Sequence, residues 1–151
     1  MEVELSLFAT DNLENGVAKA CAELDIPIVA YSPLGRGILS GKFESLSQVA
    51  PGDFLHVLPK YQGDAIKQNI KRVHALNALA EKNSLPITEL ALGWVRSLTS
   101  TKPGLPLIIP IPGGTTPDKI EQNLKAPLLS SEVMDEIDKI LEENKVVGTR
   151  Y

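Results

Sequence analysis

The sequence predicts an α/β fold in which short parallel strands alternate with helices. Three segments have the pattern of strands, at residues 2–8, 26–31 and 107–111. Each is followed by at least one stretch with apolar residues at helical spacing. Strands that alternate with helices in this way favour a parallel sheet covered by helices, although three such units are too few to close a barrel of eight strands.

The three strand patterns predict different degrees of burial. Apolar and polar residues alternate over 2–7, which predicts a strand with one apolar face and places Glu2 and Glu4 together on the polar face. Segment 26–31 is apolar and rich in β-branched residues, as is typical of a buried parallel strand. The third strand contains Pro110, which cannot donate a ladder hydrogen bond, so we expect its pairing to end there.

Helical spacing of apolar residues predicts a helix over 12–24 with Asn12 at its N-cap and a second helix over 66–82. Pro86 is expected to open a third helix, because proline is tolerated in the first turn. Residues 42–64 carry proline, glycine and aspartate at irregular spacing, so we expect a loop with little regular structure.

Two short polar residues predict the starts of the last two helices. Thr116 precedes Pro117, the combination expected at an N-cap followed by the first helical position. Ser130 is expected to cap a final helix with an acidic, solvated face. Cys21 and Trp94 fall on apolar helical stripes and are expected in the core.

Composition excludes several classes of function. The chain of 151 residues is long enough for one compact domain over 1–151, and its formal charge of −4 gives no electrostatic footprint for nucleic acid. No apolar run approaches the roughly 20 residues of a membrane span, and the N-terminus lacks a signal-peptide pattern. A single cysteine fits a reducing compartment, so we expect a cytoplasmic location, with the nucleus equally permitted.

Two turns carry the residue types of a phosphate site. Residues 31–37 follow the second strand and residues 113–116 follow the third, and both offer free backbone donors and hydroxyls. Arg36 and Lys119 add a cation to each turn, and the helix after Thr116 would favour an anion at its N-terminus. The glycines of 35–41 do not match a dinucleotide-binding fingerprint, because the third glycine comes one residue late.

Three stretches in this order resemble the aldo-keto reductase family. Residues 29–41 resemble its seventh strand and following loop, 91–95 its next helix, and 109–124 its eighth strand and phosphate-binding helix. The resemblance implies an incomplete (β/α)8 TIM barrel, namely its C-terminal part with about strands 6–8 and their helices. Residues 2–8 and 147–151 look most similar to the fungal pyridoxal reductase branch.

Carried over residue by residue, the resemblance implies a site for NADP(H). Tyr31 would stack on the nicotinamide, and Glu2 stands where the family commonly has a glutamine that holds the nicotinamide amide. A carboxylate there can accept a hydrogen bond from that amide but cannot donate one. The residues expected at the pyrophosphate are Ser32, Leu34, Gly35 and Arg36.

The same resemblance assigns the adenosine end of the cofactor to the second turn and its helix. Lys119 occupies the place of a frequent arginine for the 2′-phosphate, and a point charge there leaves the preference for NADP over NAD less certain. The residues expected at the adenosine ribose, its phosphate and the adenine are Gly113, Gly114, Thr115, Thr116, Gln122 and Asn123.

No segment matches the family's catalytic residues, an aspartate, a tyrosine, a lysine and a histidine from the first half of the barrel. Asp11, His56, Lys60 and Tyr61 have the right types in the wrong context. We therefore expect no catalytic residue in this chain, which alone should be inactive. His56 and His74 have no ligand spacing, so no metal site is expected.

Three functional hypotheses stay open at this stage. The first is a segment of a reductase that reduces a small aldehyde such as pyridoxal, and the second is a non-catalytic half-barrel that binds nucleotide or a partner protein. The third is an unrelated β/α phosphate-binding protein. Met1 is followed at once by a strand pattern, which favours a chain that lacks a preceding segment. Strands cut from a barrel expose edges and an inner face, so we expect association through them.

Overall fold

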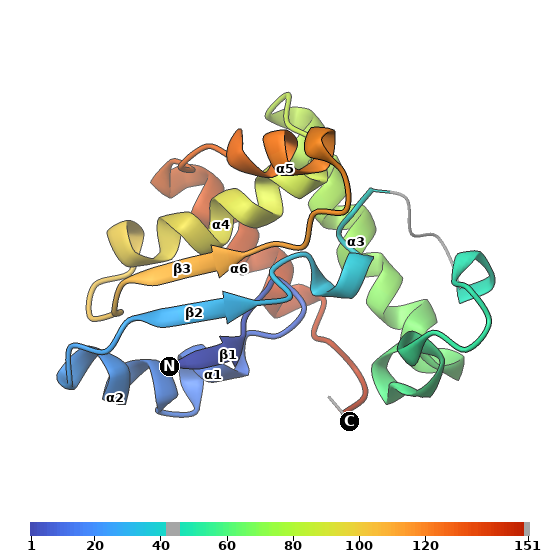
Figure 1. Cartoon of the computed structure of the whole chain (residues 1–151), viewed down its shortest axis with the longest axis horizontal. Coiled ribbons are helices and arrows are strands. Elements are labelled where there is room, and N and C mark those ends of the chain that lie inside the picture. Colours follow the sequence, from blue (N-terminus) through green and yellow to red (C-terminus); the bar gives the residue numbers. More distant parts are fainter. Residues whose placement is uncertain (42–45, 150–151) are drawn as a thin grey trace.

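A computed structural model describes residues 1–41 and 46–149. Its centre is a parallel sheet in the order β1-β2-β3, formed by β1 (Glu2–Glu4), β2 (Ile28–Tyr31) and β3 (Ile108–Ile111) (Figure 1). The predicted class and the parallel order of the strands are confirmed. All three strands run in the same direction, so their carboxyl ends meet at one edge of the sheet.

Helices cover one face of this sheet. The longest, α3, and the next, α4, follow β2, and α4 packs against β3 with α6 beside it (Figure 1). The helices are α1 (Asp11–Glu14), α2 (Val17–Glu23), α3 (Gly63–Lys82), α4 (Ile87–Thr101), α5 (Pro117–Leu124) and α6 (Ser131–Glu143). Four 3-10 turns complete the described elements: η1 (Gly35–Gly37), η2 (Leu46–Gln48), η3 (Phe54–Val57) and η4 (Pro59–Tyr61).

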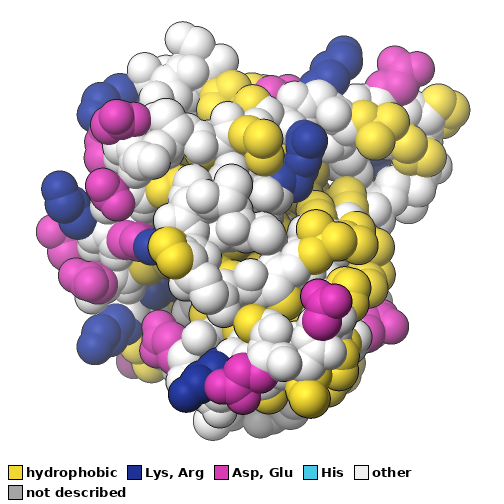
Figure 2. All heavy atoms as spheres, turned by 90° about the vertical axis from the view of Figure 1, so that its left-hand side faces the viewer, with side chains coloured by type: hydrophobic (Ala, Val, Ile, Leu, Met, Phe, Trp, Pro, Cys, Tyr) yellow, Lys and Arg dark blue, Asp and Glu magenta, His cyan; other side chains and the backbone are white. Residues whose placement is uncertain are grey.

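The core lies between the sheet and the helices. Ile28, Ala30 and Ile108 point from the strands into it, and Trp94 and Cys21 are buried there as predicted. The opposite face is open over β3, whereas at the end of β1 the Glu4 side chain on this face is buried. Ile109 and Ile111 on that face are 44% and 45% exposed, and Figure 2 shows hydrophobic side chains in a band along that side of the molecule.

The first strand is shorter than predicted. It ends at Glu4, and residues 6–9 form a turn in which the backbone groups of Ser6 and Ala9 exchange hydrogen bonds of 3.1 and 3.0 Å. The Ser6 hydroxyl accepts from the Phe8 backbone N–H at 3.0 Å, a local bond that competes with a continuing ladder. Leu5 and Leu7 are nevertheless fully buried, so the apolar face was predicted correctly.

The prediction of one helix over 12–24 was wrong. Two helices occupy this stretch, and the break falls at Asn15 and Gly16, where Gly16 adopts a φ of 96° and the Asn15 side chain accepts from the Val17 N–H. Asn12 is not an N-cap. It lies inside α1, and its amide donates to the Glu4 carbonyl at 2.9 Å, so it joins α1 to the end of β1.

The remaining boundaries lie close to the predicted ones. Where a loop over 42–64 was expected, three short 3-10 turns (η2, η3 and η4) lie within 46–61 and α3 already begins at Gly63. Residues 42–45 of that expected loop lie outside the described part of the chain. Pro110 does not end the third strand, which continues by one residue. It pairs with Ala30 in a strand that has a neighbour on one side only, a position where proline is tolerated. Among the described residues, no helix is long and apolar enough to span a membrane.

Candidate functional site

The strand register brings the two predicted turns to the same edge of the sheet. Tyr31, the last residue of β2, pairs directly with Ile111, the last residue of β3. The strands are parallel, so the segments 32–37 and 113–116 leave the sheet side by side at its carboxyl edge (Figure 1). In open α/β sheets and β/α barrels, ligands bind at this edge.

The first turn has an unusual backbone. Ser32 and Arg36 adopt φ angles of 50° and 57°, a left-handed conformation that costs about 1–2 kcal/mol for residues with a side chain. The turn is closed by bonds from the Gly35 N–H to the Ser32 carbonyl and from the Gly37 N–H to the Leu34 carbonyl, at 2.9 and 3.1 Å. Residues with such strained backbones cluster at ligand sites, and they persist only where the surrounding structure holds them in place.

The second turn leads into the N-terminus of α5. The Thr116 side chain accepts from the Lys119 backbone N–H at 3.4 Å, which confirms the predicted cap. The Lys119 ammonium donates to the Thr115 hydroxyl at 3.1 Å, so its charge lies over the turn. The Asn123 amide donates to the Gly113 carbonyl at 3.3 Å, and Gln122 is exposed on the same short helix.

Gly114 allows the second turn to lie close to its own helix. A Cβ atom at this position would lie 2.5 Å from Cγ1 of Ile120, whereas a Cβ at Gly113 would meet nothing within 4 Å. The absence of a side chain at Gly114 therefore sets the shape of the turn, and the neighbouring glycine leaves its backbone open to a ligand.

Glu2 and Tyr31 lie on the uncovered face of the sheet. Glu2 pairs with Val29, and Glu4 pairs with Tyr31, so side chains from β1 and β2 share this face in register. Glu2 is exposed and Tyr31 is half-buried. This places the predicted nicotinamide residues at the sheet and the predicted phosphate residues in the turns beyond it.

Sequence reasoning missed a buried ionic cluster beside the first turn. The Glu4 carboxylate lies 3.3 Å from the Arg36 guanidinium and 3.7 Å from the Lys60 ammonium, and the Glu4 and Lys60 side chains are almost fully buried. The Tyr61 hydroxyl donates to the Gly35 carbonyl at 2.9 Å. The strand pattern showed that Glu4 shares a face with Glu2, but nothing local predicted partners 32 and 56 residues away.

The four residues with catalytic side-chain types lie in different surroundings. Burial, with the Glu4 charge nearby, raises the pKa of Tyr61 well above its usual value, which makes its phenol a poorer acid. Lys60 is paired with Glu4, and the His56 ring lies against the Val49 and Ala50 carbonyls at 3.4 and 3.1 Å. Asp11 is exposed in α1.

Two cavities border the described part of the chain. One of about 430 Å³ lies beside the second turn and is lined by Leu92, Arg96, Pro110, Pro112, Ile120, Asn123 and Leu124. The other, of about 970 Å³, lies on the helix side between the segment after β1 and α6, and none of the predicted cofactor residues lines it. Large volume alone does not identify a site, because a binding pocket also needs a few convergent polar groups.

These features define a class of protein: a parallel β/α segment in which two loops, each with a cation and hydroxyl groups, leave the carboxyl edge of the sheet. The sequence profile of the aldo/keto reductase family matches residues 1–142, and the chain belongs to that family. This membership rules out the hypothesis of an unrelated β/α protein.

Known relatives agree with this assignment. The chain is 37% identical to the "Putative pyridoxal reductase" of Saccharomyces cerevisiae over 159 residues and 35% identical to the "Probable pyridoxal reductase 2" of Schizosaccharomyces pombe over the same length. It is 34% identical to "Aldo-keto reductase yakc [NADP(+)]" of Schizosaccharomyces pombe over 155 residues. Each match covers all of this chain but 46%, 46% and 44% of the relative.

A solved structure matches the fold of this chain, again over less than half of its own length. The glycerol dehydrogenase of Gluconobacter oxydans superposes with a TM-score of 0.80 at 21% identity, over 98% of this chain and 43% of that enzyme. The chain therefore spans about half the length of the relatives it matches, and its open sheet of three strands corresponds to part of their barrel.

Proposed function

We infer that this chain is the cofactor-binding segment of an NADP(H)-dependent oxidoreductase that reduces a small aldehyde, with pyridoxal as the leading substrate. The observation that carries the proposal is the pairing of Tyr31 with Ile111, which sets the two turns side by side. The names of the fungal relatives support the choice of substrate, and the name of the yakc relative supports NADP(H).

The residues of the two turns fit the two ends of such a cofactor. Ser32 and Leu34 are half-buried and would face the pyrophosphate, where Ser32 offers a hydroxyl. Gly35 is buried, and its N–H and carbonyl bond to Ser32 and Tyr61, so it would shape the turn through its φ of 58°. Thr115 and Thr116 would hold the adenosine ribose and its phosphate at the N-terminus of α5, with Gly113 and Gly114 giving the backbone access. Gln122 and Asn123 would line the adenine.

Lys119 would supply the preference for NADP(H) over NAD(H). Its ammonium is held over the turn by the Thr115 hydroxyl at 3.1 Å, and it is exposed. A 2′-phosphate beside it would gain a charge-assisted hydrogen bond, which a 2′-hydroxyl cannot match. Because lysine presents a point charge and not a planar fork, we expect a moderate preference.

The nicotinamide would lie against the Tyr31 ring, with Glu2 accepting from its amide. When bound, the nicotinamide supplies or accepts hydride. Tyr31 would shield one face of that ring, and Glu2 would fix its rotation. Tyr61 would be a poor proton donor, because its hydroxyl donates to the Gly35 carbonyl and burial raises its pKa. We therefore expect this chain alone to reduce pyridoxal at least about 10²–10⁴-fold more slowly than an enzyme with a positioned acid, since general acid catalysis contributes that factor.

Isothermal titration tests this proposal. NADPH and NADH are titrated into the wild-type chain and into Lys119→Met, with Lys125→Met at the C-cap of the same helix as the control. We expect NADPH to bind the wild type about tenfold more tightly than NADH, and only Lys119→Met to remove that difference. Absence of NADPH binding to the wild type, or an unchanged preference in Lys119→Met, would overturn the assignment.

A further inference from the structure

We propose that Glu4 and Lys60 are positioning residues that hold Arg36 and, through it, the shape of the turn 32–37 toward a pyrophosphate. The proposal rests on the proposed function and adds residues that do not contact the cofactor but hold the groups that do. Glu4 comes from β1, Arg36 from η1 and Lys60 from η4, so three separate elements meet at this cluster.

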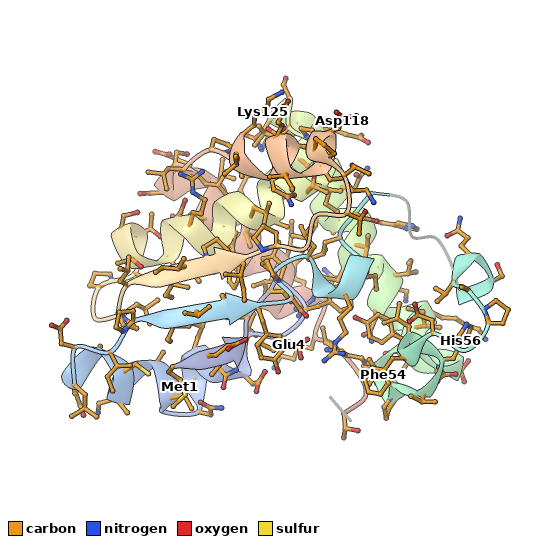
Figure 3. All side chains as sticks on the ribbon, in the orientation of Figure 1. Met1, Glu4, Phe54, His56, Asp118 and Lys125 are labelled. Carbon is orange, nitrogen blue, oxygen red and sulfur yellow. The ribbon has the colours of Figure 1, made fainter. Side chains whose placement is uncertain are left out.

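Glu4 lies at the centre of the cluster. Its two carboxylate oxygens face different cations, Oε2 toward Arg36 at 3.3 Å and Oε1 toward Lys60 at 3.7 Å. The Glu4 side chain is 1% exposed and that of Lys60 is 4% exposed, so water screens their attraction little. Figure 3 shows Glu4 at the end of β1 on the side of the molecule where Phe54 of η3 lies.

Arg36 is held on a second side by an aromatic ring. Its guanidinium lies over the Phe54 ring, 5.4 Å from the centroid, a geometry that favours a cation–π contact. The carboxylate and the ring together restrict a side chain that is otherwise long and mobile. This matters because the Arg36 backbone adopts a left-handed φ of 57°, which the surrounding contacts must maintain.

The same segment holds the backbone of the turn. The Tyr61 hydroxyl donates to the Gly35 carbonyl at 2.9 Å, directly beside Arg36 and next in sequence to Lys60. The segment 54–61 thus contacts the turn directly through the Phe54 ring and the Tyr61 hydrogen bond, and it reaches Arg36 indirectly through the Lys60–Glu4 ion pair. Packing of this kind is what a binding turn needs in order to keep its donors in place before the ligand arrives.

The net charge of the cluster determines which variant can test the proposal. Glu4, Lys60 and Arg36 sum to one positive charge beside the turn, and the carboxylate offsets the second cation. Loss of Glu4 alone would leave two buried or half-buried cations facing each other, which is costly. The double variant Glu4→Gln with Lys60→Met removes the anchor of Arg36 and keeps the same net charge, so it separates positioning from charge imbalance.

The experiment compares two probes on the full 151-residue chain. NADPH spans both turns, whereas 2′-AMP carries only the adenosine 2′-phosphate and reports on the second turn. The variants are the double change E4Q/K60M and, as the matched control, E23Q/K19M, which removes the exposed Glu23–Lys19 pair of α2. Urea unfolding of each variant shows whether it is folded.

We expect E4Q/K60M to bind NADPH about tenfold more weakly while its affinity for 2′-AMP stays within about twofold of the wild type. The control should leave both affinities unchanged. Equal weakening of both probes would mean general damage, and unchanged NADPH affinity would mean that Arg36 needs no anchor; either result overturns the positioning role. If the wild type binds neither probe, the proposed function fails as well, which distinguishes the two failures.

Discussion

Tyr31 and Ile111 are paired across neighbouring parallel strands as the last residues of each. This one relationship fixes the geometry of the site, because the backbone beyond each residue turns away at the same edge of the sheet. The first turn then carries Arg36 and the second carries Lys119, so two cations flank the edge. Residues 80 positions apart in sequence become neighbours through the pairing of β2 with β3.

Variants of two helix caps with the same hydrogen-bond length should separate an effect on stability from an effect on cofactor binding. Thr116 and Ser130 each accept from a backbone N–H at 3.4 Å, at the starts of α5 and α6. Replacing either by alanine should lower the free energy of unfolding by about 1 kcal/mol. Only Thr116→Ala should also weaken 2′-AMP binding, as measured by calorimetry. Equal affinities in the two variants would contradict the placement of the adenosine phosphate at α5.

The adjacent glycines of the second turn should differ in their tolerance of a side chain. Gly114→Ala places a Cβ 2.5 Å from Cγ1 of Ile120, so that side chain must leave its rotamer at a cost of about 1 kcal/mol. Gly113→Ala meets no neighbour and should change the free energy of unfolding by less than about 0.5 kcal/mol. Urea unfolding followed by Trp94 fluorescence checks both values, and equal costs would argue against the close approach of turn and helix.

Tyr61 should make the stability depend on alkaline pH. Its pKa is raised in the folded chain, so between its ordinary value near 10 and the higher folded value the folded state keeps the proton that the unfolded state has lost. The stability that Tyr61 contributes is therefore complete below about pH 10 and falls as the pH rises above it.

The difference in unfolding free energy between the wild type and Tyr61→Phe measures this effect. Titration of Arg72, whose pKa burial lowers to about 10, occurs in both proteins and cancels. At neutral pH the wild type should be more stable by about 1–3 kcal/mol, because the variant leaves the Gly35 carbonyl without its donor. That advantage should shrink by about 1.4 kcal/mol at pH 11. A constant difference would show that the phenol is not buried.

The uncovered sheet face should drive association of the isolated chain. Ile109 and Ile111 expose apolar surface beside an open strand edge, a combination that promotes contact between chains. The double change Ile109→Lys and Ile111→Lys should shift sedimentation profiles toward the monomer. Leu24→Lys alters an apolar residue at the end of α2 that is more exposed than either isoleucine, and it should not shift the profile. A wild-type chain that sediments as a monomer at all concentrations would contradict this expectation.

Sequence patterns predicted the sheet and the caps better than the interactions between distant residues. The three parallel strands, Thr116 and Ser130 followed from alternation and from the chemistry of single positions. The break at Gly16 was missed, because the apolar stripe of 12–24 continues through it. The residue types alone favoured Asn12 as a cap, whereas tertiary contact with the Glu4 carbonyl decides its role. The Glu4–Lys60 pair has no local signal, since only the fold brings β1 and η4 together.

The central claim is that one nucleotide is held by both turns at once. The most direct measurement is an NMR titration of the ¹⁵N-labelled chain with NADPH, following the backbone amides of 32–37 and 113–116. Joint binding predicts that amides in both turns shift along a single saturation curve, and that 2′-AMP shifts only the second set. Shifts confined to one turn under NADPH, or separate curves for the two turns, would contradict it.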